Sequence, residues 1–223
     1  MLNGLFIPGS MVTSTILIAT VGISIWAFGN ESLMRKLVMS PYAAKNKKEY
    51  HRFITSGFIH ADWMHLAFNM FSLMLFGRMV EANLVYSYGA ELGSGLYLLM
   101  YLSALVVSDL PTFNKNKNNT YYSSLGASGA VSAMVFAFIL FEPTQKLLLF
   151  MVLPIPGFLL GLMYLAYSYY QAKQPNRLDN VNHDAHLYGA LYGLAFIAVV
   201  RPITLLEFLQ KMSNFSLFEI LPF

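Results

Sequence analysis

The sequence has no cysteine and few charged residues. Without cysteine there is no disulfide, no thiolate nucleophile and no sulfur-ligated metal. Only 11% of the 223 residues are Asp, Glu, Lys or Arg, against about 25% in an ordinary soluble domain. This scarcity excludes a soluble globular enzyme and a disordered chain. The formal net charge of +3 is also too small and too dispersed to indicate a nucleic-acid partner.

What the chain has instead is apolar surface: 57% of its residues are hydrophobic and 15% are aromatic. Because charge is costly in bilayer hydrocarbon, long stretches without charge locate the membrane spans. A helix needs about 17–25 apolar residues to cross. We therefore predict an all-α polytopic membrane protein, a single domain over residues 1–223 built as a bundle of six transmembrane helices. The predicted helices cover about residues 11–28, 60–80, 91–110, 125–141, 157–171 and 184–201.

The fifth apolar stretch contains Pro154 and Pro156, which do not fit a regular helix interior. We therefore predict an apolar interfacial segment over 147–156, followed by a short fifth helix that starts at Gly157. The alternative is one kinked span through both prolines.

Three further segments have local interpretations. The long first connection, about 29–59, carries aromatic residues and both signs of charge, so we expect it to be partly folded against the membrane. The tail 203–223 mixes apolar and charged residues and is predicted to lie along the membrane surface. No Lys or Arg precedes the first apolar stretch, which reads as a retained span. Arg78 and Glu81 are expected to form an interfacial pair.

Polar side chains inside membrane spans cost free energy and are functional candidates by default. They gather near the starts of alternate helices: His60, His65 and Asn69 in the second, Ser128 in the fourth, and His183 and His186 in the sixth. Helices two, four and six enter from the same membrane face if the six helices alternate in direction. We therefore expect these groups to share one depth and to form one site open to one side.

Ser128 is flanked by glycines in Gly126-Ala-Ser-Gly129. Glycine permits a tight turn and the close approach of a neighbouring helix, and a helix N-terminus offers free N–H groups to an oxyanion. His186, Gly189 and Gly193 fall on one helical face, so that face can pack closely against the small residues of helix four. Such packing brings the imidazole within reach of Ser128, as a serine–histidine pair requires. The alternative is a packing motif beside a buried core histidine.

His65 and Asn69 are four residues apart and share one helical face. Both can donate hydrogen bonds to a tetrahedral oxyanion, although a pair that only links helices is the alternative. His60 does not share this face and is expected to brace the first connection. Asp184 is two residues before His186 and should point elsewhere, so we do not expect a third triad member.

Together these residues resemble the rhomboid family of intramembrane serine proteases. The match starts with His60-x4-His65-Leu-Ala-Phe-Asn69-Met70, followed by Gly77 and Glu81. It continues with Gly126-Ala-Ser128-Gly129 and then Ala185-His186-x2-Gly189-Ala-Leu-x-Gly193, in family order from about Arg52 to Arg201. Each motif alone is weak, whereas three in order are specific. The family's frequent Trp-Arg pair is replaced by Tyr50-His51-Arg52, which leaves the role of Arg52 open.

The resemblance implies a dyad without an acid, with Ser128 as nucleophile and His186 as general base. It assigns oxyanion stabilisation to His65, Asn69 and the Ser128 amide. Structural or gating roles fall to His60, Gly126, Gly129, Gly189 and Gly193. No cofactor or metal is implied. The expected partners are transmembrane protein substrates and membrane lipid, while the oligomeric state is not indicated.

The implied reaction is hydrolysis of a peptide bond in or beside a transmembrane helix, with water reaching the site past the polar run 120–124 and the short fifth helix as gate. The positive-inside rule conflicts with the family orientation, because few cations (Arg78, Lys146, Arg201 and Lys211) lie on the face opposite the site. We follow the resemblance, which implies a cytoplasmic (inner) membrane with the active site opening to the outer face.

Two other functions remain open. One is a catalytically silent relative that binds membrane helices, although such proteins usually lack the serine or the histidine. The other is a metal-dependent membrane hydrolase or transporter that uses His60, His65, His183 and His186, although no His-Glu-x2-His signature is present.

Overall fold

The computed structural model describes residues 10–149, 152–174, 179 and 181–216. The helices are α1 (Met11–Phe28), α2 (Glu31–Leu37), α3 (Pro41–Asn46), α4 (Arg52–Thr55), α5 (Trp63–Ser72), α6 (Arg78–Tyr88), α7 (Ala90–Asn116), α8 (Ser128–Phe141), α9 (Gly157–Ala172), α10 (His183–Val200) and α11 (Ile203–Ser213). A 3-10 turn, η1 (Ser56–Phe58), follows α4, and a π-helical turn, η2 (Leu73–Gly77), joins α5 to α6. Two short strands, β1 (Lys146–Leu149) and β2 (Leu153–Pro156), precede α9.

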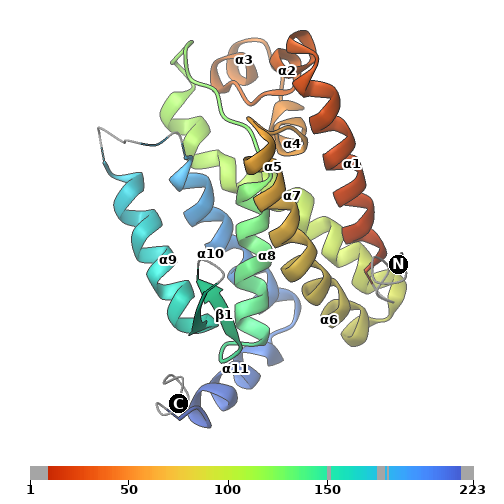
Figure 1. The fold of residues 1–223 in the computed structure, drawn as a ribbon, viewed down its shortest axis with the longest axis vertical. Coiled ribbons are helices and arrows are strands. Elements are labelled where there is room, and N and C mark those ends of the chain that lie inside the picture. Colours follow the sequence, from red (N-terminus) through yellow and green to blue (C-terminus); the bar gives the residue numbers. More distant parts are fainter. Residues whose placement is uncertain (1–9, 150–151, 175–178, 180, 217–223) are drawn as a thin grey trace.

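Helix α8 lies at the centre of the bundle, with α9 on one side and α5 on the other (Figure 1). Every α8 residue except Ser128 and Val135 is buried. A helix that is apolar on all faces is stable only when it is surrounded, so the sequence of α8 accounts for its central place. The first connection lies at one end of the bundle, and β1 and α11 lie at the other (Figure 1).

Two of the described helices, α1 and α7, are each long and apolar enough to cross a membrane. The pair α10 and α11 meets the same criteria together, with a bend of 111° between the two helices. Helix α8 is apolar but has only 14 residues. The described part of the chain is therefore mostly helical and rich in apolar helices. Helix length and composition support two or three spans among the described residues, fewer than the six predicted.

The second predicted helix is longer than expected and is interrupted. It runs as α5, the π-helical turn η2 and α6 as far as Tyr88, beyond the predicted end at residue 80. Gly77 is the last residue of the π-helical turn, and a Cβ there would lie 2.6 Å from the Tyr97 hydroxyl and 2.8 Å from Leu73, so a side chain at this position would displace its neighbours. Such turns inside helices occur often at functional sites.

Glu81 does not form the interfacial pair that the sequence suggested, because it is fully buried. Its carboxylate accepts hydrogen bonds from the N–H groups of Val12 (2.9 Å) and Thr13 (2.8 Å) and from the Thr13 hydroxyl (2.6 Å). A helix N-terminus carries partial positive charge, so the carboxylate caps α1 and fixes it to α6.

The first connection is partly folded, as predicted, into α2, α3, α4 and η1. Arg52, whose role the sequence left open, is buried here and donates to the carbonyls of Arg35 (3.0 Å) and Val38 (2.6 Å). Its Nε donates to Glu49 at 2.6 Å, and this hydrogen bond lowers the pKa of the Glu49 carboxyl. Arg52 therefore holds the end of α2 against α4.

The segment predicted as an apolar interfacial stretch over 147–156 contains two paired strands, which corrects the purely helical description. Strands β1 and β2 pair antiparallel, with Lys146 opposite Pro156. Proline lacks a backbone N–H, and it is tolerated in a short two-stranded ribbon because every strand there is an edge strand. Helix α9 begins at Gly157, directly after Pro156, so the start predicted for the fifth helix is confirmed and the kinked span is not.

Helix α11 is held to the end of the bundle by two ion pairs. Arg201 donates to both carboxylate oxygens of Glu207 (2.5 and 2.8 Å), and Lys211 donates to Glu142 (2.8 Å). Its apolar residues Ile203, Leu205, Leu206 and Leu209 remain exposed. This pattern fits the predicted interfacial tail as far as residue 216, and residues 217–223 lie outside the described part.

Candidate active site

The turn before α8 is built to present Ser128 as the first residue of the helix. Gly126 has φ +113°, a conformation that glycine adopts without strain. The N–H of Gly126 donates to the Ser56 carbonyl at 2.9 Å. The N–H of Ala127 donates to His60 Nε2 at 3.4 Å. The first N–H groups of α8, starting with Ser128, have no partner inside the helix.

Gly126 also makes room for His65. A side chain at Gly126 would lie 2.6 Å from His65 Cε1 and 2.7 Å from Nε2. The His65 ring is therefore packed directly on the turn that precedes Ser128. Substitution at Gly126 would both strain the backbone and displace this ring.

Helices α8 and α10 meet through glycine, as their small-residue faces predict. A Cβ at Gly189 would clash with the carbonyl of Gly129, and a Cβ at Gly193 would clash with the carbonyl of Ala133. A Cβ at Gly129 would in turn clash with the Ser108 side chain of α7. Helices α8 and α10 are therefore in backbone contact at Gly129, directly after Ser128, and again at Ala133 one turn further along, while the Ser108 side chain of α7 packs against Gly129. Larger residues would not allow this separation.

A cavity of about 720 Å³ lies between α5, α8, α9 and α10. It is lined by His65 and Asn69 from α5, Ser128 and Ser132 from α8, Tyr164 from α9, and His186 from α10. The four residues predicted from the sequence as nucleophile, base and oxyanion donors therefore all line this cavity. Ser123 and Ser124, from the polar run before α8, also line it.

Within the part of the chain that the structure describes, the side chains of Ser128 and His186 form no hydrogen bond, either with each other or with another residue. The His186 ring instead lies parallel to the Tyr164 ring, with centroids 6.2 Å apart and an interplanar angle of 19°. It also meets the His183 ring edge-on at 6.0 Å. Hydrogen bonds in catalytic pairs are often long until substrate binds.

The two predicted oxyanion donors are held by their own helix. Asn69 Nδ2 donates one hydrogen to the His65 carbonyl at 2.9 Å, which leaves its second N–H for another acceptor. His65 Nδ1 accepts from the Ala61 N–H at 3.5 Å, so in the neutral ring we assign the proton to Nε2. Asp62 caps the helix by accepting from the His65 N–H at 2.8 Å.

His60 lies where it can hold the first connection in place, as predicted from its position off the face of His65 and Asn69. It is fully buried, and its Nδ1 lies 3.0 Å from Ser24 Oγ of α1. Because Ala127 donates to Nε2, Nδ1 carries the proton and Ser24 passes its own hydrogen to the Phe58 carbonyl at 3.0 Å. His60 thus ties α1 and the first connection to the residue before Ser128.

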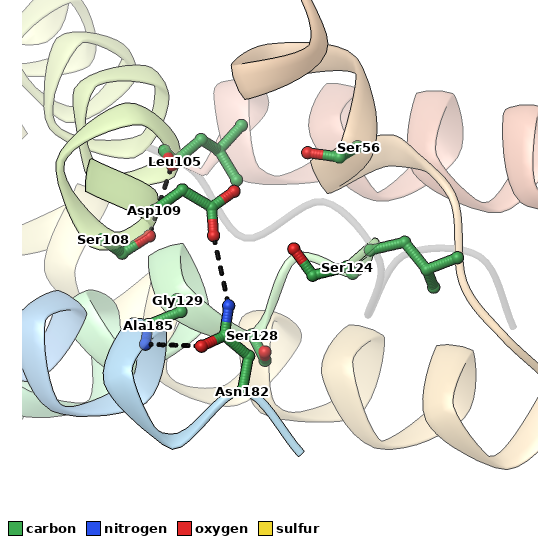
Figure 2. Close-up of a pocket in the computed structure, with 11 residues that line it drawn as sticks. Ser56, Leu105, Ser108, Asp109, Ser124, Ser128, Gly129, Asn182 and Ala185 are labelled. Carbon is green, nitrogen blue, oxygen red and sulfur yellow. Dashed lines mark hydrogen bonds between the residues drawn. The ribbon is translucent and has the colours of Figure 1, made fainter. Parts of the chain in front are cut away.

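Behind Ser128 lies a smaller polar cavity that the sequence did not reveal (Figure 2). Asn182 sits between Asp109 of α7 and Ala185 of α10 in this view. Its Oδ1 accepts from the Thr112 hydroxyl (2.9 Å) and the Ala185 N–H (3.2 Å), and its Nδ2 donates to Asp109 at 3.4 Å. Asn182 therefore caps α10 one turn before His186. An asparagine directly before an apolar helix is a recognisable start signal, whereas nothing in the sequence pairs it with Asp109.

The other candidate ligands and acids have separate partners. Asp184 binds Lys115 at 2.7 Å, in agreement with its exclusion from the dyad. His183 Nε2 lies 3.1 Å from Asp179. Among the described residues, no three His, Asp or Glu side chains form a group that could hold a metal ion.

Comparison with known proteins identifies the family of the chain. A family model described as "Rhomboid domain" matches residues 47–203. RHOMBOID-like protein 12, mitochondrial, of Arabidopsis thaliana is 31% identical over 196 residues, which cover 83% of this chain and 56% of that protein. Rhomboid-like protein 11, chloroplastic, of the same plant is 31% identical over 175 residues, covering 72% of this chain and 56% of that protein. Rhomboid protein 1, mitochondrial, of Saccharomyces cerevisiae is 28% identical over 146 residues, covering 64% of this chain and 40% of that protein.

The chain thus spans about half the length of the curated relatives it matches. Their names refer to mitochondria and chloroplasts, and so give no support to the cytoplasmic membrane expected from the sequence. A rhomboid domain together with apolar helices identifies a membrane protein. Since the family model matches most of the chain and a relative is 31% identical over 83% of it, the chain belongs to the rhomboid family.

Proposed function

We propose that this protein is an intramembrane serine endopeptidase that cleaves peptide bonds in or next to the transmembrane helices of other membrane proteins. Members of the rhomboid family are generally intramembrane serine proteases. The observation that carries the proposal is one cavity lined by both predicted pairs, Ser128 with His186 and His65 with Asn69.

In the proposed reaction, His186 removes the proton from Ser128 Oγ as this oxygen attacks the substrate carbonyl carbon. The negative charge that develops on the carbonyl oxygen is stabilised by the Ser128 amide, His65 Nε2–H and the free N–H of Asn69. Collapse of the tetrahedral intermediate breaks the C–N bond of the substrate and forms the acyl-enzyme, and His186 gives its proton to the leaving amine. Water then attacks the acyl-enzyme, with His186 again acting as base, and Ser128 is released.

The proposed membrane arrangement uses α1, α5 with α6, α7, α8, α9 and α10 as six spans of one domain. Helix α8, with 14 residues, is about 21 Å long, whereas bilayer hydrocarbon is about 30 Å thick. A helix that starts at Ser128 therefore holds the nucleophile below one membrane surface. The polar run before α8, of which Ser123 and Ser124 line the cavity, is the proposed route for water. Family orientation favours a site that opens to the outer face.

Substrate access is proposed between α5 and α9, because Phe68 and Ser72 of α5 and Tyr164 of α9 form opposite walls of the cavity. A helical substrate hides its carbonyls in hydrogen bonds, so a segment must unwind before Ser128 can reach it. Glycine and proline weaken helices by about 1 and 3 kcal/mol per residue. Substrates with such residues near the cleaved bond are therefore expected to be preferred.

The test is to purify the full chain in detergent and to measure cleavage of a model transmembrane substrate together with labelling by a fluorophosphonate. Ser128→Ala and His186→Ala should both abolish cleavage, and label should be found on Ser128. Ser213→Ala, on the exposed side of α11, and His51→Ala, in the first connection, serve as matched controls and should retain activity. Cleavage that survives Ser128→Ala would refute the proposal.

The same assay separates the two alternatives. A catalytically silent helix-binding relative predicts neither labelling nor cleavage over a panel of substrates. A metal-dependent protein predicts cleavage that a chelator removes, whereas the serine mechanism predicts indifference to the chelator.

A further inference from the structure

Tyr164 is the feature of the cavity that neither the sequence motifs nor the proposed reaction uses. It belongs to α9, yet its ring is stacked on His186 of α10 with a centroid separation of 6.2 Å and an interplanar angle of 19°. This geometry falls within the range of favourable offset stacking. Tyr164 also lines the cavity that Ser128 and His186 share.

The hydroxyl of Tyr164 reaches a third helix. It lies 2.7 Å from Ser132 Oγ, and Ser132 is one turn after Ser128 on α8. The Tyr164 ring is further packed against Phe136 of α8, with centroids 5.6 Å apart. One side chain of α9 therefore binds the helix of the nucleophile and covers the face of the base.

No hydrogen bond from the described residues orients the His186 ring, so its orientation depends on ring packing. The two rings in contact with it are Tyr164, which is parallel, and His183, which is edge-on. His183 is itself held by Asp179 at 3.1 Å. Stacking against the Tyr164 ring is therefore the contact that fixes the plane of the His186 imidazole.

We propose that Tyr164 is a positioning residue for His186, so that the base is aligned only while α9 is docked against α8. This inference rests on the proposed function. Displacement of α9 by an incoming helix would break the hydrogen bond to Ser132 and the ring stack together. Substrate access and base alignment are then mutually exclusive states of α9, and the chemical step follows the return of the helix.

The experiment compares Tyr164→Leu, Tyr164→Phe and a control, Tyr170→Leu, which makes the same change at a position of α9 that is 63% exposed. Because a stacked ring pair contributes modestly, Tyr164→Leu should lower kcat and the labelling rate by about 2- to 10-fold, with KM changed less than two-fold. Tyr164→Phe keeps the ring and should restore both rates to within about two-fold of the original protein. Tyr170→Leu should leave both unchanged.

A spectroscopic readout keeps this inference separate from the protease proposal. In protein labelled with 13C at histidine Cε1, the His186 signal, identified by its loss in His186→Ala, should be shifted upfield by the Tyr164 ring. Tyr164→Leu should remove this shift and Tyr164→Phe should restore it. Failure to label or cleave with the original protein would refute the protease function, but the shift would still show whether Tyr164 orders the ring. An unchanged signal and unchanged kcat in Tyr164→Leu, or equal losses in Leu and Phe variants, would overturn the positioning role.

Discussion

Gly189→Ala perturbs the contact between α8 and α10 with a single methyl group. The added Cβ would clash with the Gly129 carbonyl oxygen, and would lie 2.8 Å from the Gly129 carbonyl carbon and 3.1 Å from its Cα. Carbon atoms pack at about 3.5–4.0 Å. Because the obstacle is backbone, it cannot move aside as a side chain would. The two helices must therefore separate by about 1 Å at this level.

The consequences for stability and activity should differ in size. Overpacking costs about 1–3 kcal/mol, whereas replacing helical glycine with alanine recovers about 1 kcal/mol, so the free energy of unfolding should fall by no more than about 2 kcal/mol. Gly129 is adjacent to Ser128, and Gly189 is one turn from His186. A misplacement of about 1 Å between reacting groups can cost about 10²-fold in rate. We therefore expect a loss of about that size in kcat.

The assay is thermal unfolding in detergent alongside kcat and the rate of fluorophosphonate labelling. Gly22→Ala in α1 is the matched control, since nothing lies within 4 Å of a Cβ there, and it should leave the labelling rate unchanged. Gly193→Ala clashes with Ala133 one turn further from the dyad, so it should reduce stability similarly but kcat less. A Gly189→Ala protein that labels at the original rate would refute the idea that this glycine contact sets the dyad distance.

Three other predictions concern single polar groups. Glu81→Gln should lower the free energy of unfolding by about 1–3 kcal/mol because it removes the charged cap of α1; the exposed Glu91→Gln is the control, and equal midpoints for the two in thermal unfolding would contradict the capping role. Asn69→Ala should lower kcat by about 10²–10³-fold through the loss of one oxyanion donor, with little change in melting temperature; a rate within two-fold of the original protein would exclude that donor. The hydrogen bond from Arg201 lowers the pKa of Glu207, so its stabilising effect is complete above the ordinary carboxyl pKa of 4.5 and is lost as the pH falls through the lower value in the folded protein. The difference in melting temperature between the original protein and Glu207→Gln should therefore shrink below about pH 4.5, and a difference independent of pH would show that the carboxylate is not the stabilising group.

Much of the helical pattern could be predicted from the sequence because it depends on local composition. The prediction of a first helix over 11–28 agrees with α1 at Met11–Phe28, and its C-terminal end is marked by Gly29 and by the first charged residue, Glu31. The start at Gly157 followed from proline sterics, which act within one turn. The close contact between α8 and α10 could be predicted because the sequence itself shows small residues at helical spacing on both helices.

The parts that could not be predicted depend on contacts between residues far apart in the chain. Nothing near Glu81 in the sequence shows that its partners are the N–H groups of Val12 and Thr13, 69 and 68 residues away. The stacking of Tyr164 on His186 could not be predicted for the same reason. Helix α9 has several tyrosines, and only the packing of three helices places this one against His186. The hairpin before α9 was missed because the apolar run has no clear alternation. The count of six spans also exceeds what helix lengths alone support, since α8 is short and α5 is separated from α6 by a π-helical turn.

The low content of charged residues, 11% of the chain, bears on how the helices around the site are held together. In a bilayer, helices are not driven together by the hydrophobic effect, so they associate through close packing and interhelical hydrogen bonds. Two ionisable groups are used for this purpose: Glu81 joins α6 to α1, and Asp184 joins α10 to Lys115 of α7. Each holds a helix end, and each lies outside the cavity of Ser128 and His186. Within the described residues, the side chains of Ser128 and His186 have no hydrogen bonds. In the proposed reaction this keeps the serine oxygen and the imidazole available to a substrate carbonyl and to water.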